Sequence, residues 1–277
     1  MSGEEKVMDE QEYVLGTDDD ELTRLGLQHE LWREVALQGW ERGGFRAGHA
    51  LLDVGCGPGY ATFDMTRLVG DEGRVVGVDV SQRFVNHLKA QREARGLRNV
   101  TARMMNVEEL DLPVCDFDGA FARWVLCFVS SPAAVVEGVA RSLKRGGTFV
   151  VQDYCHYEGV TIGPRDGIFG RVFGAVAETW RARGGDPNVG SVVPSLMERC
   201  GLEVKEINAI SRVARPGTPL WQWPETFFKN YLPTLVELNS ITEAEKKVFE
   251  NAWQERVSDP GSFIITPPMV EVVGIKR

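Results

Sequence analysis

Three glycines within five residues interrupt an apolar stretch of the sequence, in LLDVGCGPGYAT. They are Gly55, Gly57 and Gly59, and they directly follow a run that is typical of a buried strand. Glycine tolerates backbone conformations that bring the chain close against a ligand. A turn of this kind after a strand is typical of nucleotide-binding sites, and three chemistries begin in this way. The residues around the turn decide among them.

Two of these three sites fit the residues around the turn poorly. A P-loop ends in Gly-Lys-Ser or Gly-Lys-Thr, and no lysine follows Gly59 before Lys89. The dinucleotide fingerprint needs its third glycine at position 60, which is Tyr60 here. Pro58 also removes an N–H group from the place where a diphosphate would need donors. The turn therefore favours a less anionic ligand such as S-adenosylmethionine (SAM), and NAD is the less favoured alternative.

Two carboxylates stand where they could bind the polar groups of SAM. Asp53 precedes the glycine turn and could organise the site around the ammonium group of the ligand. Asp79 ends a second apolar run, VVGVDVS, where a carboxylate can accept hydrogen bonds from both ribose hydroxyls. Asp79 could instead cap the following helix, but Ser81 is already suited to that role. We therefore expect Asp79 to bind the ribose.

Candidate proton-transfer groups cluster in QDYCHYE, at the end of the fifth expected strand. Ligands of open α/β sheets bind beyond the carboxyl ends of the strands, so this segment should face the site. His156 is the favoured base because histidine exchanges protons near neutral pH, although an exposed loop histidine is the alternative. No third ligand accompanies it at a metal-binding spacing, so no metal site is expected. The candidate bases are Asp153, Tyr154, His156 and Glu158.

Alternating strand and helix patterns supply the elements that position these residues. From about Ala47 to Tyr154, apolar runs with strand character alternate with amphipathic helices, and two late strands follow. Because the runs are almost continuously apolar, the strands should form a parallel sheet that is covered on both faces. The expected fold class is α/β, with a doubly wound, mostly parallel seven-stranded sheet of Rossmann-like type.

Two segments stand outside this alternation and are expected to act as lids. The N-terminal segment carries a helix with Thr17 as its cap, and two helices follow residue 213, the second beginning at a Thr242–Glu245 capping box. The aromatic residues of LWQWPETFFKNYL could line an apolar pocket for a planar or lipophilic molecule. The expected division is an N-terminal helical lid (1–46), a SAM-binding core (47–213), a helical insertion serving as substrate lid (214–258) and the final core strand (259–277).

Taken together, the motifs resemble the class I SAM-dependent methyltransferases. LLDVGCGPGYAT is similar to their glycine motif, VVGVDVS to their acidic second-strand motif and LKRGGTFVVQDY to their fifth strand. The resemblance covers about Tyr13 to Asp153 and is greatest for the small-molecule enzymes of the ubiquinone/menaquinone-biosynthesis type. It implies SAM as cofactor and S-adenosylhomocysteine as its product. It also implies cofactor contacts at Tyr13, Gln28, Asp53, Gly55, Cys56, Gly57, Gly59, Asp79, Val80, Asn106, Val107 and Arg123.

Two of these positions need comment. Asn106 and Val107 stand where the family usually has Asp-Ala or a similar pair. An amide still donates and accepts hydrogen bonds at the adenine edge, so binding should be kept with a weaker contact to the adenine N6. Arg123 corresponds to a family position that reaches the methionine tail of SAM, with a surface ion pair as the alternative role.

The composition of the 277-residue chain narrows its partners. A formal net charge of −9 leaves no basic face for a phosphate backbone, so a nucleic-acid substrate is disfavoured. Scattered cysteines, no signal-peptide core and no apolar run long enough for a membrane span indicate a cytoplasmic protein. We therefore expect an enzyme, a SAM-dependent methyltransferase of a small, apolar or aromatic molecule, acting as a monomer or homodimer. A non-catalytic SAM-binding or scaffolding protein is the alternative, and an NAD-dependent oxidoreductase is less favoured.

Overall fold

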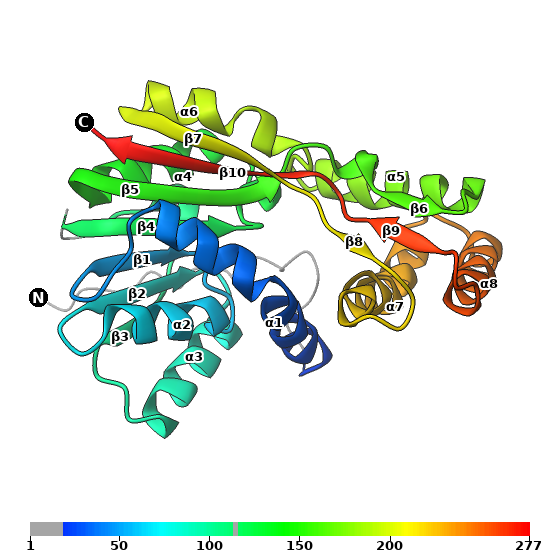
Figure 1. Cartoon of the computed structure of the whole chain (residues 1–277), viewed down its shortest axis with the longest axis horizontal. Coiled ribbons are helices and arrows are strands. Elements are labelled where there is room, and N and C mark those ends of the chain that lie inside the picture. The colour runs from blue at the N-terminus through cyan, green and yellow to red at the C-terminus, as the bar shows by residue number, and fades with distance from the viewer. Residues whose placement is uncertain (1–18, 113–115) are drawn as a thin grey trace, which may run out of the picture.

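The computed structural model describes residues 19–112 and 116–277, and a seven-stranded sheet is its largest element (Figure 1). Its strands are β1 (Ala50–Val54), β2 (Arg74–Asp79), β3 (Val100–Met104), β4 (Phe117–Arg123), β5 (Leu143–Tyr154), β7 (Leu202–Ile210) and β10 (Met269–Lys276). They lie in the order β3-β2-β1-β4-β5-β10-β7. β1 to β5 pair in parallel, whereas β10 is antiparallel to both of its neighbours. The predicted fold class is confirmed.

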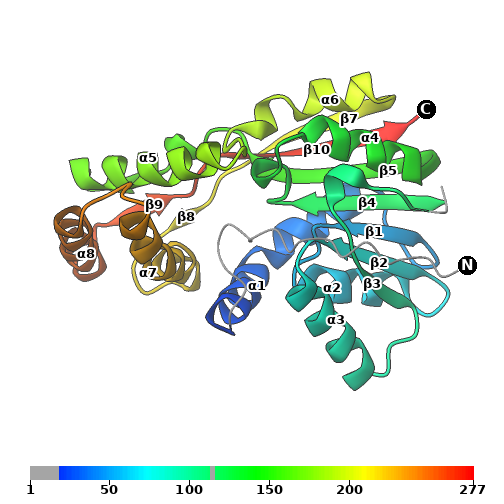
Figure 2. The same ribbon diagram turned by 180° about the vertical axis from the view of Figure 1, so that it is seen from behind.

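Helices cover both faces of this sheet (Figures 1 and 2). One face carries α1 (Asp19–Arg42), α2 (Tyr60–Val69) and α3 (Gln82–Ala94), and the other carries α4 (Pro132–Ser142) and α6 (Val193–Arg199). Successive residues of a strand point to opposite faces. In β1, Leu51 therefore joins the core beneath α1 to α3, and Leu52 joins the core beneath α4. Burial on both faces explains why the strands are almost continuously apolar.

Two boundaries differ from those that the sequence suggests. The pattern SPAAVVEGVARSLKRGG predicts a helix over residues 131–147, but α4 ends at Ser142 because β5 already begins at Leu143 and pairs there with β4. The run SFIITPPMVEVVGIK predicts one late strand over residues 262–276, with two prolines that suit an edge or an irregular strand start. The structure has two strands there, β9 (Phe263–Ile265) and β10. Pro267 and Pro268 separate them, because proline has no N–H group to donate to a strand ladder.

A smaller three-stranded sheet and three helices form a lobe beside one end of the large sheet, and we call this lobe the cap (Figure 1). The cap consists of β6 (Thr161–Gly163), β8 (Val213–Ala214), β9, α5 (Gly167–Ala182), α7 (Gln222–Glu237) and α8 (Glu243–Ser258). α7 and α8 are the expected insertion, and the Thr242–Glu245 capping box begins α8. The division of the chain at residues 213 and 258 stays a prediction. Helix α5 packs with the insertion, since its Phe169 and Phe173 rings lie 5.4 Å from those of Phe249 and Phe228.

A buried polar network holds α1 across the sheet. The Gln152 amide nitrogen donates to the Glu271 carboxylate at 2.7 Å and to the carbonyl of Val35 in α1 at 2.9 Å. Gly39 permits this approach, because a Cβ atom there would lie 2.4 Å from a Glu271 oxygen. The other end of α1 reaches the cap, where the Trp223 indole donates to Gln28 at 2.9 Å.

Two expectations about the N-terminus fall outside this description. The Thr17 cap and the Tyr13 contact lie before the described residues. Within residues 19–112 and 116–277, no helix is both long and apolar enough to cross a membrane.

Candidate functional site

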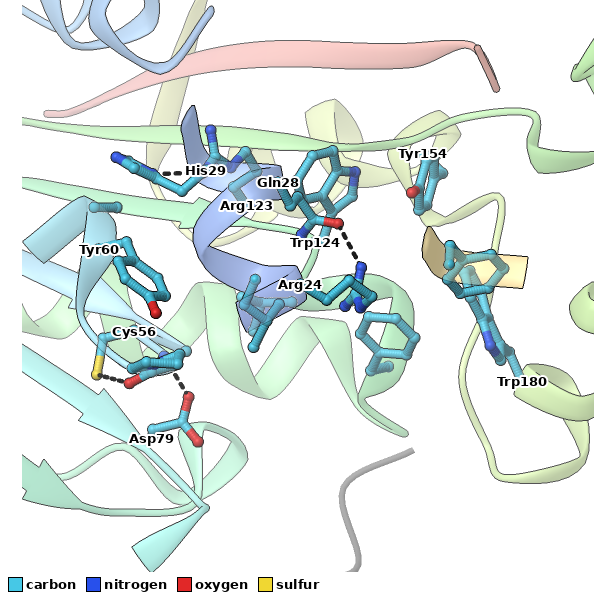
Figure 3. A pocket seen from close by; sticks show the side chains of 18 of the residues that line it. Arg24, Gln28, His29, Cys56, Tyr60, Asp79, Arg123, Trp124, Tyr154 and Trp180 are labelled. Carbon is cyan, nitrogen blue, oxygen red and sulfur yellow. Dashed lines mark hydrogen bonds between the residues drawn. The ribbon is translucent and has the colours of Figure 1, made fainter. Parts of the chain in front are cut away.

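A cavity of about 250 Å³ lies beyond the carboxyl ends of β1, β2, β4 and β5, between the large sheet, α1 and the cap (Figure 3). Its two ends differ in chemistry. The polar end, beside the glycine turn, is lined by Asp53, Gly55, Gly57, Asp79, Asn106 and Arg123. The aromatic end, beside the cap, is lined by Trp124, Tyr154, Tyr157, Trp180, Trp223 and Phe227. Figure 3 shows Tyr154 and Trp180 across the cavity from Cys56 and Asp79.

The glycine turn between β1 and α2 needs glycine at all three positions, for different reasons. Gly55, Gly57 and Gly59 have φ angles of 64°, 52° and 93°, in the left-handed region that favours glycine. A Cβ atom at Gly55 or Gly59 would also lie 2.5 Å from a side chain, that of Val125 or Leu88. At Gly57 a Cβ atom would meet nothing within 4 Å. Gly57 is therefore the position at which the backbone itself borders the space open to a ligand.

Asp79 ends β2 and closes onto this turn. One carboxylate oxygen accepts from the Gly57 backbone N–H at 2.8 Å, and the other accepts from Ser81 N–H at 2.9 Å. Ser81 caps α3 by accepting from Phe84 N–H at 3.3 Å, as predicted. Burial raises the pKa of Asp79 above its usual value. Each carboxylate oxygen has a second lone pair, so Asp79 can still accept from hydroxyl groups in the cavity.

Asp53 and Arg123 place opposite charges at the polar end. Asp53 is 3% exposed and accepts from the Thr62 hydroxyl at 2.6 Å. Burial raises its pKa to about 7, while the attraction of Arg123 acts in the opposite direction. The Arg123 guanidinium donates to the Trp32 carbonyl at 3.2 Å and lies 5.0 Å above the Trp124 ring. Burial lowers the pKa of Arg123 to about 10, so it remains a cation at neutral pH.

The pKa of Asp53 leads to a pH-dependent prediction. The Asp53 carboxyl gains its charge as the pH rises through about 7, and only the charged form attracts an ammonium group. SAM affinity should therefore rise by about tenfold between about pH 5.5 and about pH 7.5, and SAM binding near pH 7 should release a proton. Calorimetry in buffers of different ionisation enthalpy measures both effects. Asp53→Asn should remove the slope, and an unchanged slope in that variant would assign it to another group.

Among the other predicted cofactor residues that the structure describes, Gly59 alone does not line the cavity. Gln28, Cys56, Val80 and Val107 line the same cavity. Asn106 also lines it, and its side-chain oxygen accepts from Glu108 N–H at 3.0 Å to begin a short 3₁₀ turn at residue 107. An asparagine at this position thus keeps the capping role that an aspartate would have. Cofactor contacts of all these residues stay predictions.

The structure separates the four candidate bases. Tyr154 lines the cavity, whereas Asp153, His156 and Glu158 do not. Asp153 points away from Tyr154, because neighbouring strand residues face opposite sides, and one of its oxygens accepts from Leu126 N–H at 2.9 Å. His156 follows the strand end and is exposed. We therefore retain only Tyr154 as a group that could contact an acceptor, and its role stays a proposal.

Several residues of the cavity were not assigned to it from the sequence. Tyr157 and Trp180 come from segments that pattern analysis places on a loop and a helix. Arg24 was not assigned either. It lies one helical turn from Gln28, a predicted cofactor residue on α1, and its guanidinium donates to the Gln28 oxygen at 3.0 Å. That spacing of polar residues on an amphipathic helix is the one local signal that could have suggested a buried polar contact.

Comparisons with known proteins agree with this geometry. Residues 45–169 match the family model described as "Methyltransferase domain". The chain is 30% identical over 129 residues to a demethylmenaquinone methyltransferase of Lactococcus lactis, an alignment that covers 47% of this chain and 50% of that protein. It is 29% identical over 100 residues to an aklanonic acid methyltransferase of Streptomyces, covering 36% of this chain and 46% of the relative. The chain thus spans about half the length of the curated relatives that it matches.

Solved structures share the fold over a longer part of the chain. A Bacillus subtilis protein, YcgJ, superposes with a TM-score of 0.60 at 19% identity, over 88% of this chain and 98% of that one. At 19% identity, this structural similarity shows a shared fold only. Residues 45–169 are thus similar to a methyltransferase domain, and the glycine turn of Gly55, Gly57 and Gly59 lies within this range.

Proposed function

We propose that this protein transfers a methyl group from SAM to a small apolar or aromatic molecule. The observation that carries the proposal is the continuity of the cavity, which joins the glycine turn to a wall of aromatic side chains. A site that bound only the cofactor would account for the polar end of the cavity and not for the aromatic end. The aromatic end gives a second molecule a place beside the first.

The charges and hydrogen-bonding groups of the polar end suit SAM. Asp53 would face the ammonium group, Arg123 the carboxylate, and Asp79 the ribose hydroxyls, so each of these charged side chains would gain a hydrogen-bonding partner in the ligand. The open space beside Gly57 is where the backbone would border the ligand. SAM supplies an electrophilic methyl group on a positively charged sulfur.

The aromatic end suits a planar or apolar acceptor. The centre of the Trp124 ring lies 6.0 Å from that of Tyr154 and 5.9 Å from that of Trp223 in stacked arrangements, and all three rings line the cavity. Methyl transfer forms a bond from the acceptor to the methyl carbon while the sulfur–methyl bond breaks, and the electron pair stays on sulfur. A wall that excludes water aligns the two molecules and favours this neutralisation of charge.

Tyr154 would position the acceptor instead of removing its proton. Burial raises the pKa of Tyr154 well above its usual value, so the hydroxyl stays protonated at neutral pH. A protonated hydroxyl can donate a hydrogen bond to an acceptor oxygen, but it is a poor base. The proton of a hydroxylated acceptor would then pass to water, or the acceptor would bind already ionised.

The names of the relatives support an acceptor of this kind. Demethylmenaquinone and aklanonic acid, named for two of them, are small molecules. We extend this class to the present chain because its aromatic end provides a matching surface. The α1 residues Arg24, Leu25 and Gln28 line the cavity, which supports a lid role for the segment 1–46.

The proposal is tested by product formation. Protein incubated with methyl-labelled SAM and a panel of phenolic, quinol and amine acceptors should release S-adenosylhomocysteine only when an acceptor is present. SAM binding without transfer to any acceptor would favour the non-catalytic alternative. Binding of NAD in place of SAM would favour an oxidoreductase, although Tyr60 already donates to the Leu22 carbonyl at 3.0 Å where that fold needs glycine.

Turnover should not depend on a metal ion. Within the described part of the chain, no group of three or more His, Cys, Asp and Glu side chains is placed to hold one. Methyl transfer assayed after treatment with EDTA should match the untreated rate within about twofold, since alignment and desolvation need no Lewis acid. Loss of turnover that magnesium restores would contradict this expectation.

A further inference from the structure

His29 joins three elements at the polar end of the cavity. It lies on α1, is 8% exposed and lines the cavity. Its Nε2 atom lies 3.1 Å from an oxygen of Asp64 on α2, and its Nδ1 atom lies 3.1 Å from a guanidinium nitrogen of Arg123 at the end of β4. Figure 3 shows the His29 and Arg123 side chains side by side.

The two partners determine the tautomer of His29. A guanidinium group only donates hydrogen bonds, so Nδ1 must be the acceptor. The proton of the neutral ring is then on Nε2, where it is donated to the Asp64 carboxylate. Asp64 remains charged, because it also accepts from Arg33 and Arg67. Burial lowers the pKa of His29, in agreement with a neutral ring.

Arg123 needs such a partner to point in one direction. Its guanidinium is half-buried and has two described hydrogen-bond partners, the Trp32 carbonyl and the His29 ring. A planar guanidinium presents its remaining donors in a fixed fork, so two anchored nitrogens determine where the fork points. Without His29, one N–H group of this half-buried cation would lack its partner.

We propose that His29 is a positioning residue that holds Arg123 toward the carboxylate of the bound cofactor. The inference rests on the proposed function, in which Arg123 binds that carboxylate. It goes further in making the histidine on α1, with its anchor Asp64, part of the cofactor site. Its effect should be confined to ligands that carry the amino-acid tail.

The same geometry makes the contact sensitive to acid. Protonation of His29 would place an N–H group of a cation against the Arg123 guanidinium, where Nδ1 now accepts. The charged groups that face the ring are Asp64 on α2, Arg33 on α1 and Arg123 on β4, and the uncharged Tyr60 ring stacks at 6.2 Å. Burial of the ring and the two positive charges beside it all disfavour its ionisation.

Two ligands separate positioning from folding. S-adenosylhomocysteine carries the carboxylate, and 5′-methylthioadenosine lacks the whole amino-acid tail. In calorimetry at pH about 7.5, His29→Leu should weaken the binding of S-adenosylhomocysteine by about tenfold. It should weaken the binding of 5′-methylthioadenosine by less than about twofold. His29→Gln keeps one donor and one acceptor, so it should recover most of the affinity. In an Asp53→Asn background, where Asp53 no longer titrates, His29→Gln should also remove the loss of affinity that protonation of His29 causes in acid.

The control is His49→Leu, which also replaces a histidine with leucine. His49 directly precedes β1, at the opposite end of the strands from the cavity. It should leave both affinities unchanged. If His29→Leu lost affinity for both ligands equally, or for neither, the proposed role of His29 would be wrong, and the proposed function would be unaffected. Wild-type protein that bound neither ligand would instead overturn the proposed function, and with it this inference.

Discussion

Replacing Asp79 with alanine should weaken SAM binding by a factor of about 10² to 10⁴. Two charge-assisted hydrogen bonds to the ribose would be lost, each contributing about 1.5–3 kcal/mol. The glycine turn would also lose an anchor, because Asp79 accepts from Gly57 N–H at 2.8 Å. Isothermal titration calorimetry with SAM measures the loss directly.

Asp118→Ala is the matched control for this variant. Asp118 also accepts from a backbone N–H of a neighbouring segment, that of Ala50 at 2.8 Å, but at the amino end of the strands. Its removal should lower the melting temperature without changing SAM affinity. The ribose assignment fails if Asp79→Ala and Asp118→Ala bind SAM equally well.

The second large effect is expected from Gly57→Val, which should abolish measurable SAM binding. A side chain at position 57 would occupy the space that the structure leaves open beside the turn. The φ angle of 52° adds backbone strain of about 1–2 kcal/mol, and this strain lowers stability independently of the ligand. Loss of binding and loss of stability must therefore be measured separately.

Gly96→Val separates the two effects. Gly96 has a φ angle of 63°, and a Cβ atom there would also meet nothing within 4 Å, but it follows α3 outside the cavity. The melting temperature should fall by a similar amount in both variants, and only Gly57→Val should lose SAM binding. A Gly57→Val protein that is folded and binds SAM normally would show that the ligand lies elsewhere.

The cofactor end could be predicted because its signals are local. The three glycines, the strand-ending Asp79 and the Ser81 cap are each recognisable within a few residues, and parallel strands bring their carboxyl ends to one edge. The alternation of strands and helices likewise predicts the sheet, since each apolar run must be buried on both faces. The prolines at 267 and 268 signalled an irregular strand, although not that its two parts belong to different sheets.

The tertiary structure alone decided the rest of the site. Nothing near His29 in the sequence indicates Asp64 or Arg123, which lie 35 and 94 residues away along the chain. The same holds for the choice among neighbours at the end of β5, where Tyr154 faces the cavity and Asp153 is turned toward backbone N–H groups. Hydrogen-bonding and aromatic contacts act over a few ångströms in space. Their partners are therefore set by how helices pack on the sheet, which short-range sequence patterns do not encode.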